Sequence, residues 1–258
     1  LMVGRMVQFV RKPNDSIRDE YVLETRSLTK AGNYKDINLQ LRKGEILGIT
    51  GLVGAGRTEV VQTLFGINQP DSGAILIEGK QAVIKNTEDA VRHGIAMVPE
   101  SRQEEGLVLN KSVADNVVLS VLKRYVNKLR MLDRRKLDAV ALEWIKKLNI
   151  RPGFPDMLAE KLSGGNQQRL VIAKWLLSSP KILIIDEPTN GIDVGAKEEI
   201  HEILRELARQ GMGIIMVSSE LPEVLAVADR IIVMRRGRVV NELQGSLATQ
   251  EGIISQAL

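Results

Sequence analysis

The chain has 258 residues, of which 44% are hydrophobic and 26% charged, with a formal net charge of +4. A chain of this length can bury a sizeable core as one large domain or two small ones. It has no cysteine and only two separate histidines, which excludes disulfides, thiolate chemistry and a histidine metal cluster. Aromatic residues make up 3%, and the basic residues are spread along the chain, so no nucleic-acid-binding surface is expected. No apolar run approaches the ~18 residues of a membrane helix. With no secretory signal either, we expect an intracellular protein that reaches a membrane only through a partner.

The first 19 residues show no sustained hydrophobic period and contain Pro13-Asn14-Asp15-Ser16, as is typical of a linker. The first residue is Leu, not Met, which favours a piece of a longer polypeptide. We therefore expect residues 1–19 to be a linker from a preceding domain and residues 20–258 to form one domain.

Strand and helix patterns alternate along the remainder of the chain. Strands are predicted at 21–28, 35–41, 46–49, 74–77, 95–98, 182–185, 214–217, 230–234 and 239–240. Helices are predicted after residue 58, from Ser112 or Asp115 to about 122, over 137–148, over about 166–177, and at about 196–210 and 221–228. The alternation favours an α/β fold with a mostly parallel sheet. Residues 107 to about 180 carry helical patterns between strands, which predicts a helical insert.

A glycine-rich loop follows the strand at 46–49 and leads into the first helix. It reads Gly51-Leu52-Val53-Gly54-Ala55-Gly56-Arg57-Thr58. Glycines let backbone N–H groups surround an anion, and a helix start directs its free N–H groups at the same anion. The Thr58 hydroxyl stands where a magnesium ligand is expected. The loop therefore predicts a site for a nucleotide phosphate tail, although a glycine-rich turn packed on a sheet would give a similar pattern.

Two carboxylates, Asp186 and Glu187, end the fully apolar strand at 182–185. Ligands of open α/β sheets bind at the carboxyl ends of the strands. In such a site Asp186 would hold magnesium, and Glu187 would orient or deprotonate an attacking water. An acidic pair that merely caps the next segment is the simpler alternative.

A second anion-binding pattern is Leu162-Ser163-Gly164-Gly165-Asn166, at the start of a predicted helix. A hydroxyl, bare backbone N–H groups and the helix dipole all favour a negative ligand. Taken alone, the segment reads as a serine-capped helix. Ser163 stands 23 residues before Asp186, which favours the functional interpretation.

Together these motifs resemble the nucleotide-binding domain of ATP-binding cassette (ABC) transporters, over about residues 21–243. The resemblance implies a P-loop NTPase core, an N-terminal antiparallel β subdomain and an α-helical subdomain at about 107–180. It implies that two such domains pair head to tail, with ATP and Mg²⁺ between the P-loop of one and the L-S-G-G segment of the other. Carried over, Gly51 to Thr58 is the P-loop, Ser163 to Asn166 the signature segment, Asp186 the magnesium carboxylate, Glu187 the catalytic base and 190–193 the D-loop. An adenine-stacking aromatic would be Tyr34, but its spacing from the P-loop favours a packed surface tyrosine.

A narrower resemblance is to the second half of the tandem ATPase subunit of bacterial carbohydrate importers of the ribose, galactose and xylose type. The matching segments are 2–5, 54–59, 98–102 with Gly106-Leu107, and 193–197. This resemblance implies as partners the first ATP-binding half of the same polypeptide, transmembrane permease subunits, and indirectly a periplasmic sugar-binding protein. It implies a location at the cytoplasmic face of the bacterial inner membrane.

Five positions depart from the general family pattern. They are Arg57 for the P-loop lysine, Glu59 for a threonine, Glu100 for the Q-loop glutamine, Asn166 for the last signature glutamine, and Ser219 for the switch histidine. Arginine is a planar fork, whereas lysine is a point charge. A carboxylate at 59 would repel an α-phosphate, by roughly 4 kcal/mol for unit charges at 4 Å and a dielectric near 20.

We therefore hypothesise that the P-loop site of this chain hydrolyses ATP slowly or not at all, while its signature segment completes the site on the other half. The retained base, Glu187, argues the other way. Two alternatives stay open: a regulatory module that holds nucleotide without chemistry, and a soluble ABC ATPase of DNA repair or translation.

Overall fold

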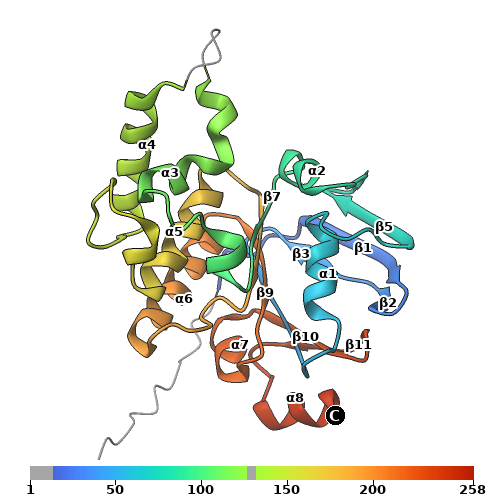
Figure 1. Cartoon of the computed structure of the whole chain (residues 1–258). Coiled ribbons are helices and arrows are strands. Elements are labelled where there is room, and N and C mark those ends of the chain that lie inside the picture. Colours follow the sequence, from blue (N-terminus) through green and yellow to red (C-terminus); the bar gives the residue numbers. More distant parts are fainter. Residues whose placement is uncertain (1–13, 127–131) are drawn as a thin grey trace, which may run out of the picture.

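The computed structural model describes residues 14–126 and 132–258, so the predicted linker is covered only from Asn14 onward. A six-stranded sheet in the order β11-β10-β4-β9-β8-β7 runs through the centre (Figure 1). Its strands are β4 (Ile46–Gly51), β7 (Ile95–Val98), β8 (Ile182–Asp186), β9 (Gly213–Val217), β10 (Arg230–Arg235) and β11 (Arg238–Gln244). Neighbouring strands are parallel except for the β10–β11 hairpin. The predicted fold class, α/β with a mostly parallel sheet, is confirmed.

The apolar strands of this sheet are buried on both faces. In β8, Ile182 and Ile184 pack toward one layer, and Leu183 and Ile185 toward the other. Side chains alternate across a strand, so a strand covered on both faces has to be apolar throughout. This explains why β8 and β9 show continuous apolar runs in the sequence.

An antiparallel sheet lies beside the central sheet, and α1 packs between the two sheets (Figure 1). It consists of β1 (Tyr21–Lys30), β2 (Tyr34–Ile37), β3 (Gln40–Arg42), β5 (Ser72–Ile77) and β6 (Lys80–Ala82). The strand predicted at 35–41 is wrong in one respect, because it divides into β2 and β3. Asp36 has a positive φ of 56°, and the Asn38 side chain accepts a hydrogen bond from the Ser27 amide, which interrupts the strand.

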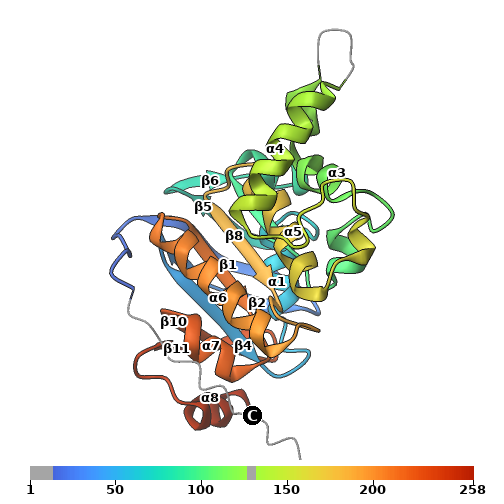
Figure 2. The same ribbon diagram turned by 90° about the vertical axis from the view of Figure 1, so that its left-hand side faces the viewer.

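Between β7 and β8 the chain is helical. The elements are η1 (Arg102–Gly106, a π-helix), α3 (Val113–Val118), η2 (Leu119–Tyr125), α4 (Arg134–Lys147), η3 (Ala159–Lys161) and α5 (Gly164–Leu176). Ser112, not Asp115, caps α3, since its hydroxyl accepts from the Asp115 amide at 3.0 Å. In Figure 2, α4 projects away from the body of the molecule, and α5 lies between α4 and the central sheet.

The remaining helices are α1 (Arg57–Leu64), α2 (Thr87–Arg92), α6 (Val194–Arg209), α7 (Leu221–Val227) and α8 (Gln250–Ala257). The sequence patterns did not predict α2 and α8. The two layers of the core divide at the central sheet, with α1 and α2 on one side and α5 to α8 on the other. Among the described residues, no helix combines the length and the apolar character needed to cross a membrane.

Candidate functional site

The glycine loop leaves the end of β4, at the centre of the sheet, and enters α1. Gly51 has φ 154°, and a Cβ there would lie 2.2 Å from the carbonyl oxygen of Met234 on β10. At Gly56, with φ 92°, a Cβ would lie 2.8 Å from the Asn33 carbonyl oxygen. Gly54 has φ 80° and no atom within 4 Å of the Cβ position, so it borders open space. Two of the glycines thus allow close backbone packing that fixes the loop, and the third faces a cavity.

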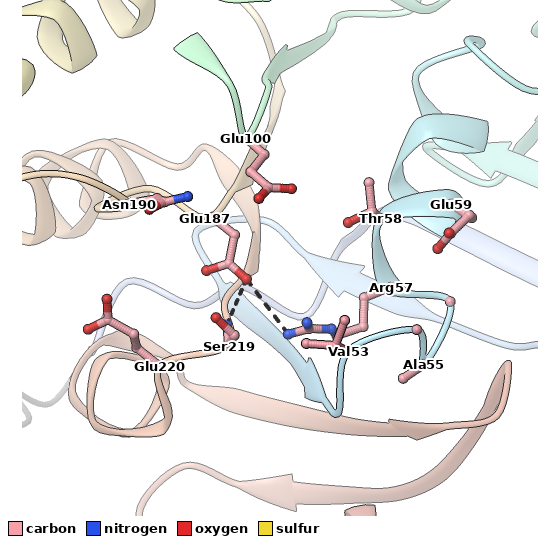
Figure 3. A pocket seen from close by; sticks show the side chains of 12 residues that line it. Val53, Ala55, Arg57, Thr58, Glu59, Glu100, Glu187, Asn190, Ser219 and Glu220 are labelled. Atoms are coloured by element: carbon pink, nitrogen blue, oxygen red, sulfur yellow. Dashed lines mark hydrogen bonds and ion pairs between the residues drawn. The ribbon is translucent and has the colours of Figure 1, made fainter.

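This cavity, of about 270 Å³, brings together residues from four segments of the chain. Its lining residues are Val53, Gly54, Ala55, Gly56, Arg57, Thr58, Glu59, Glu100, Glu187, Asn190, Ser219 and Glu220. Figure 3 shows the side chains of Glu100, Glu187 and Ser219 facing those of Arg57 and Thr58. The predicted residues from 54 to 59, with Glu100, Glu187 and Ser219, therefore share one site, whereas Gly51 supports the loop from behind.

Asp186 is 1% exposed, and both of its carboxylate oxygens are buried without a hydrogen-bond partner. Burial raises its pKa to about 7, the neighbouring Thr58 hydroxyl opposes this rise, and the nearby Glu187 and Glu100 carboxylates add to it. The Arg57 charge also opposes the rise, but neither carboxylate oxygen accepts a hydrogen bond within the described residues. A hard cation with oxygen ligands fits this place, and Mg²⁺ is commonly held by one or two protein groups together with substrate phosphates. Thr58 and Asp186 are the residues that would hold it.

Glu187 lies next to Asp186, with a positive φ of 45°. One of its carboxylate oxygens, Oε1, accepts a hydrogen bond from the backbone N–H of Ser219 at 2.9 Å. The same oxygen lies 3.9 Å from Nη1 of Arg57, as the dashed lines in Figure 3 show. Burial raises the pKa of Glu187, and the Ser219 hydrogen bonds and the Arg57 charge act against that rise. The P-loop arginine therefore points at the candidate base in this structure.

The signature segment lies apart from this cavity, since none of the four residues Ser163 to Asn166 lines it. Ser163 is exposed and is the N-cap of α5. Its hydroxyl oxygen accepts from Nδ2 of Asn166 at 2.9 Å, and Oδ1 of Asn166 accepts from the Arg151 amide at 2.8 Å. Both ends of the Asn166 amide are thus used within the chain.

Arg102 has a positioning role that the sequence did not reveal. Its guanidinium donates to the carbonyl oxygens of Asn190 at 2.6 Å and Gly191 at 3.2 Å. A Cβ on Gly164 would lie 2.7 Å from Nη2 of Arg102. Arg102 therefore connects the segment after β7 to the D-loop and to the start of α5. Because Arg102 is far in the sequence from the residues it contacts, no local pattern predicts these hydrogen bonds.

The suggestion that Tyr34 stacks on adenine is wrong, and so is the alternative of a surface tyrosine. Tyr34 is 3% exposed, and its hydroxyl donates to Oγ1 of Thr63 at 2.7 Å. It does not line the cavity. The first turn after β1 places it under α1, in the core between the two sheets.

These features define the class of protein. Residues 34–190 match the ABC transporter family, and the chain belongs to that family. Its fold is that of an ABC ATPase. The chain superposes on a nucleotide-free ATP-binding cassette from an ABC transporter with a TM-score of 0.77 at 21% identity, over 92% of this chain and 94% of that one. It matches cbiO1 from Clostridium perfringens, part of the ABC transporter complex cbiONQ, with a TM-score of 0.76 at 26% identity, over 92% and 93%.

Among curated proteins, ribose import ATP-binding proteins are similar to this chain over its whole length. The chain is 45% identical over 257 residues to the ribose import ATP-binding protein RbsA of Bacillus subtilis, covering 99% of this chain and 52% of that protein. It is 46% identical over 259 residues to RbsA of Clostridium perfringens (strain 13), covering 100% and 52%. The chain thus spans about half the length of the curated relatives it matches.

Proposed function

We propose that this chain is an ATP-binding, energy-coupling half of a carbohydrate importer of the ribose and galactose type. The similarity to ribose import ATP-binding proteins at 45–46% identity supports the sugar class. The half-length coverage supports a partner half in the same polypeptide. The further partners would be transmembrane permease subunits, and through them a periplasmic sugar-binding protein, with this chain at the cytoplasmic face of the membrane.

In this proposal the loop amides from Gly54 to Thr58 bind the phosphate tail of ATP, and Thr58 and Asp186 hold Mg²⁺. When bound, Mg²⁺ neutralises phosphate charge and fixes phosphate geometry. The supporting observation is the buried carboxylate of Asp186, which has two unpartnered oxygens beside the phosphate loop. Glu187 would act on the attacking water as general base.

We further propose that this site turns over ATP slowly or not at all, whereas the Ser163-Gly164-Gly165 segment completes the site on the other half. The observation that carries this is the contact between Arg57 and Glu187. One oxygen of the base, Oε1, accepts from the Ser219 amide and lies 3.9 Å from the guanidinium, so this oxygen is less available to a water. A serine at position 219 also has no imidazole to offer a γ-phosphate.

Binding and turnover by the purified chain give the first test. We expect a fluorescent ATP analogue with Mg²⁺ to bind wild type and the distant control Glu251→Gln equally, and to bind Thr58→Ala at least about tenfold more weakly. Phosphate release by the chain alone should stay near background. Equal binding by wild type and Thr58→Ala would contradict the assigned site.

The second test uses the full-length polypeptide, with Glu187→Gln and Glu251→Gln compared. If the site of this half is nearly inactive, Glu187→Gln should keep most of the ATP turnover, because the other half carries it. Complete loss of turnover in Glu187→Gln would end the proposal of a degenerate site. Absence of turnover in both the chain and the full-length protein would favour a regulatory nucleotide-binding module.

The sugar class is tested in cells that lack the gene, by uptake of labelled ribose, galactose and xylose. Loss of ribose uptake, restored by the intact gene, is the expected result. Unchanged uptake of all three sugars would favour the alternative of a soluble ABC ATPase, which should then be found with DNA or ribosomes and not with a permease.

A further inference from the structure

Three polar side chains form a buried cluster beneath the candidate site. They are His201 on α6, Glu223 on α7 and Ser218 directly after β9, with exposures of 0%, 2% and 0%. Nε2 of His201 lies 2.7 Å from Oε1 of Glu223. The Ser218 hydroxyl donates to the other carboxylate oxygen, Oε2, at 2.6 Å. Both oxygens of a fully buried carboxylate are therefore used to connect a helix, a second helix and a loop.

The cluster continues into the loop that reaches the candidate base. The hydroxyl oxygen of Ser218 accepts a hydrogen bond from the Glu220 amide at 3.1 Å. This bond closes a short turn over Ser219, whose own amide donates to Glu187 at 2.9 Å. Lys197 on α6 adds an outer support, because its ammonium pairs with the Glu220 carboxylate at 2.6 Å. The direction of the Ser219 N–H is thus set by Ser218 and Glu223, which do not line the cavity, together with Glu220, which does.

Burying a carboxylate is costly unless its oxygens are well bonded. His201 on α6 bonds one oxygen of Glu223, and the other oxygen still needs a partner. In this chain the second oxygen of Glu223 accepts from the hydroxyl of Ser218, and Ser218 directly precedes Ser219, whose amide donates to Glu187. The backbone amide of Ser219 donates to Glu187 at 2.9 Å, and both this amide and the Ser219 hydroxyl favour the ionised carboxyl.

We propose that His201 is a positioning residue for Glu187, acting through Glu223 and Ser218 on the backbone amide of Ser219. The inference rests on the role of general base proposed above for Glu187. His201 orients the Glu223 carboxylate, that carboxylate orients the Ser218 hydroxyl, and the hydroxyl fixes the turn that presents the Ser219 N–H.

The test uses the full chain without nucleotide, so that it does not depend on ATP binding or turnover. Exchange of the Ser219 amide hydrogen with water and the titration of the Glu187 carboxyl are followed by NMR, with Glu187→Gln identifying the carboxyl signal. The variants are His201→Met, His201→Gln and Ser218→Ala. The matched control is His93→Met, the other histidine of the chain, at the end of α2.

We expect His201→Met and Ser218→Ala each to speed exchange of the Ser219 amide by about tenfold, the loss of one hydrogen bond to a charged group. The Glu187 carboxyl should titrate at a higher pH than in wild type, because a bond that stabilises its ionised form is weakened. His201→Gln should return both readings toward wild type, since its side-chain N–H can replace Nε2. His93→Met should change neither.

The proposal is overturned if both readings in a folded His201→Met protein match wild type. It is also overturned if exchange rises equally at all amides of α6 and α7, which would indicate a purely structural pair. If His201→Met does not fold, Ser218→Ala decides, because it removes the last connection to the loop and leaves the buried pair intact. Any of these results leaves the proposed ATP site untouched, since Thr58→Ala tests that site separately.

Discussion

The substitution Asp186→Asn should make the nucleotide-free chain more stable at alkaline pH than at acid pH, relative to wild type. Burial raises the pKa of Asp186 to about 7, from an ordinary value of 3.8. When folding raises the pKa of an acid, the acid is protonated in both states below its unfolded pKa and does not change the free energy of unfolding there. The cost grows as the pH rises from about 4 to about 7 and is constant above that range. Wild type should therefore lose stability over this range, and the variant should not.

The magnitude follows from the size of the pKa change. Each unit corresponds to ~1.36 kcal/mol, so an ionised Asp186 costs the folded state about 4 kcal/mol above pH 7. Between pH 5 and pH 8, the part of this cost that changes is about 2.5 kcal/mol. The asparagine amide adds a pH-independent penalty of about 1–3 kcal/mol for its own burial. The difference between variant and wild type should thus move by about 2.5 kcal/mol in favour of the variant from pH 5 to pH 8.

Urea unfolding, followed by the fluorescence of Trp144 and Trp175, measures this difference at pH 5, 6, 7 and 8. Val60→Ala is the control, because Val60 is fully buried in α1 and its truncation removes no charge. Its loss of stability should be the same at every pH. A constant difference between Asp186→Asn and wild type across the four pH values would refute the assignment of a buried carboxyl whose pKa is raised by folding.

Three further results are expected. Tyr34→Phe should lower the free energy of unfolding by about 1 kcal/mol, because its buried hydrogen bond to Thr63 is lost. The affinity for an ATP analogue should stay unchanged. A tenfold loss of affinity would instead support the interpretation that Tyr34 stacks on adenine. Gly51→Ala should destabilise the chain by more than about 3 kcal/mol, because its Cβ would lie 2.2 Å from a β10 carbonyl oxygen, whereas Gly54→Ala meets no atom within 4 Å and should cost about 1 kcal/mol in strain. Equal melting temperatures of these two variants would contradict that reasoning. Arg57→Met should raise the pKa of Glu187, since a cation that favours the ionised carboxyl is removed; an unchanged carboxyl titration in NMR would show that the ion pair is not formed in solution.

Much of the fold could be predicted because its signals are local. The apolar runs Ile182–Ile185 in β8 and Ile214–Val217 in β9 arise because helices cover both faces of the sheet, and α6 carries a strong helical period. Short elements gave weaker signals. In α2 only Ala90 is buried, so six polar-rich residues showed no periodic apolar face. The division between β2 and β3 depends on a side-chain bond from Asn38 to another strand, which no local pattern contains.

The sequence by itself determined where the glycine loop, the acidic pair and the Leu162–Asn166 segment stand, because each is a short run that can be recognised from its own residues. Only the tertiary structure decided what those residues face. Arg57 contacts Glu187 across 130 positions of sequence, Tyr34 enters the core, and Arg102 reaches the D-loop. The physical reason is that such contacts depend on how distant segments pack. The strength of a hydrogen bond or an ion pair changes markedly when its two groups move apart by about one ångström.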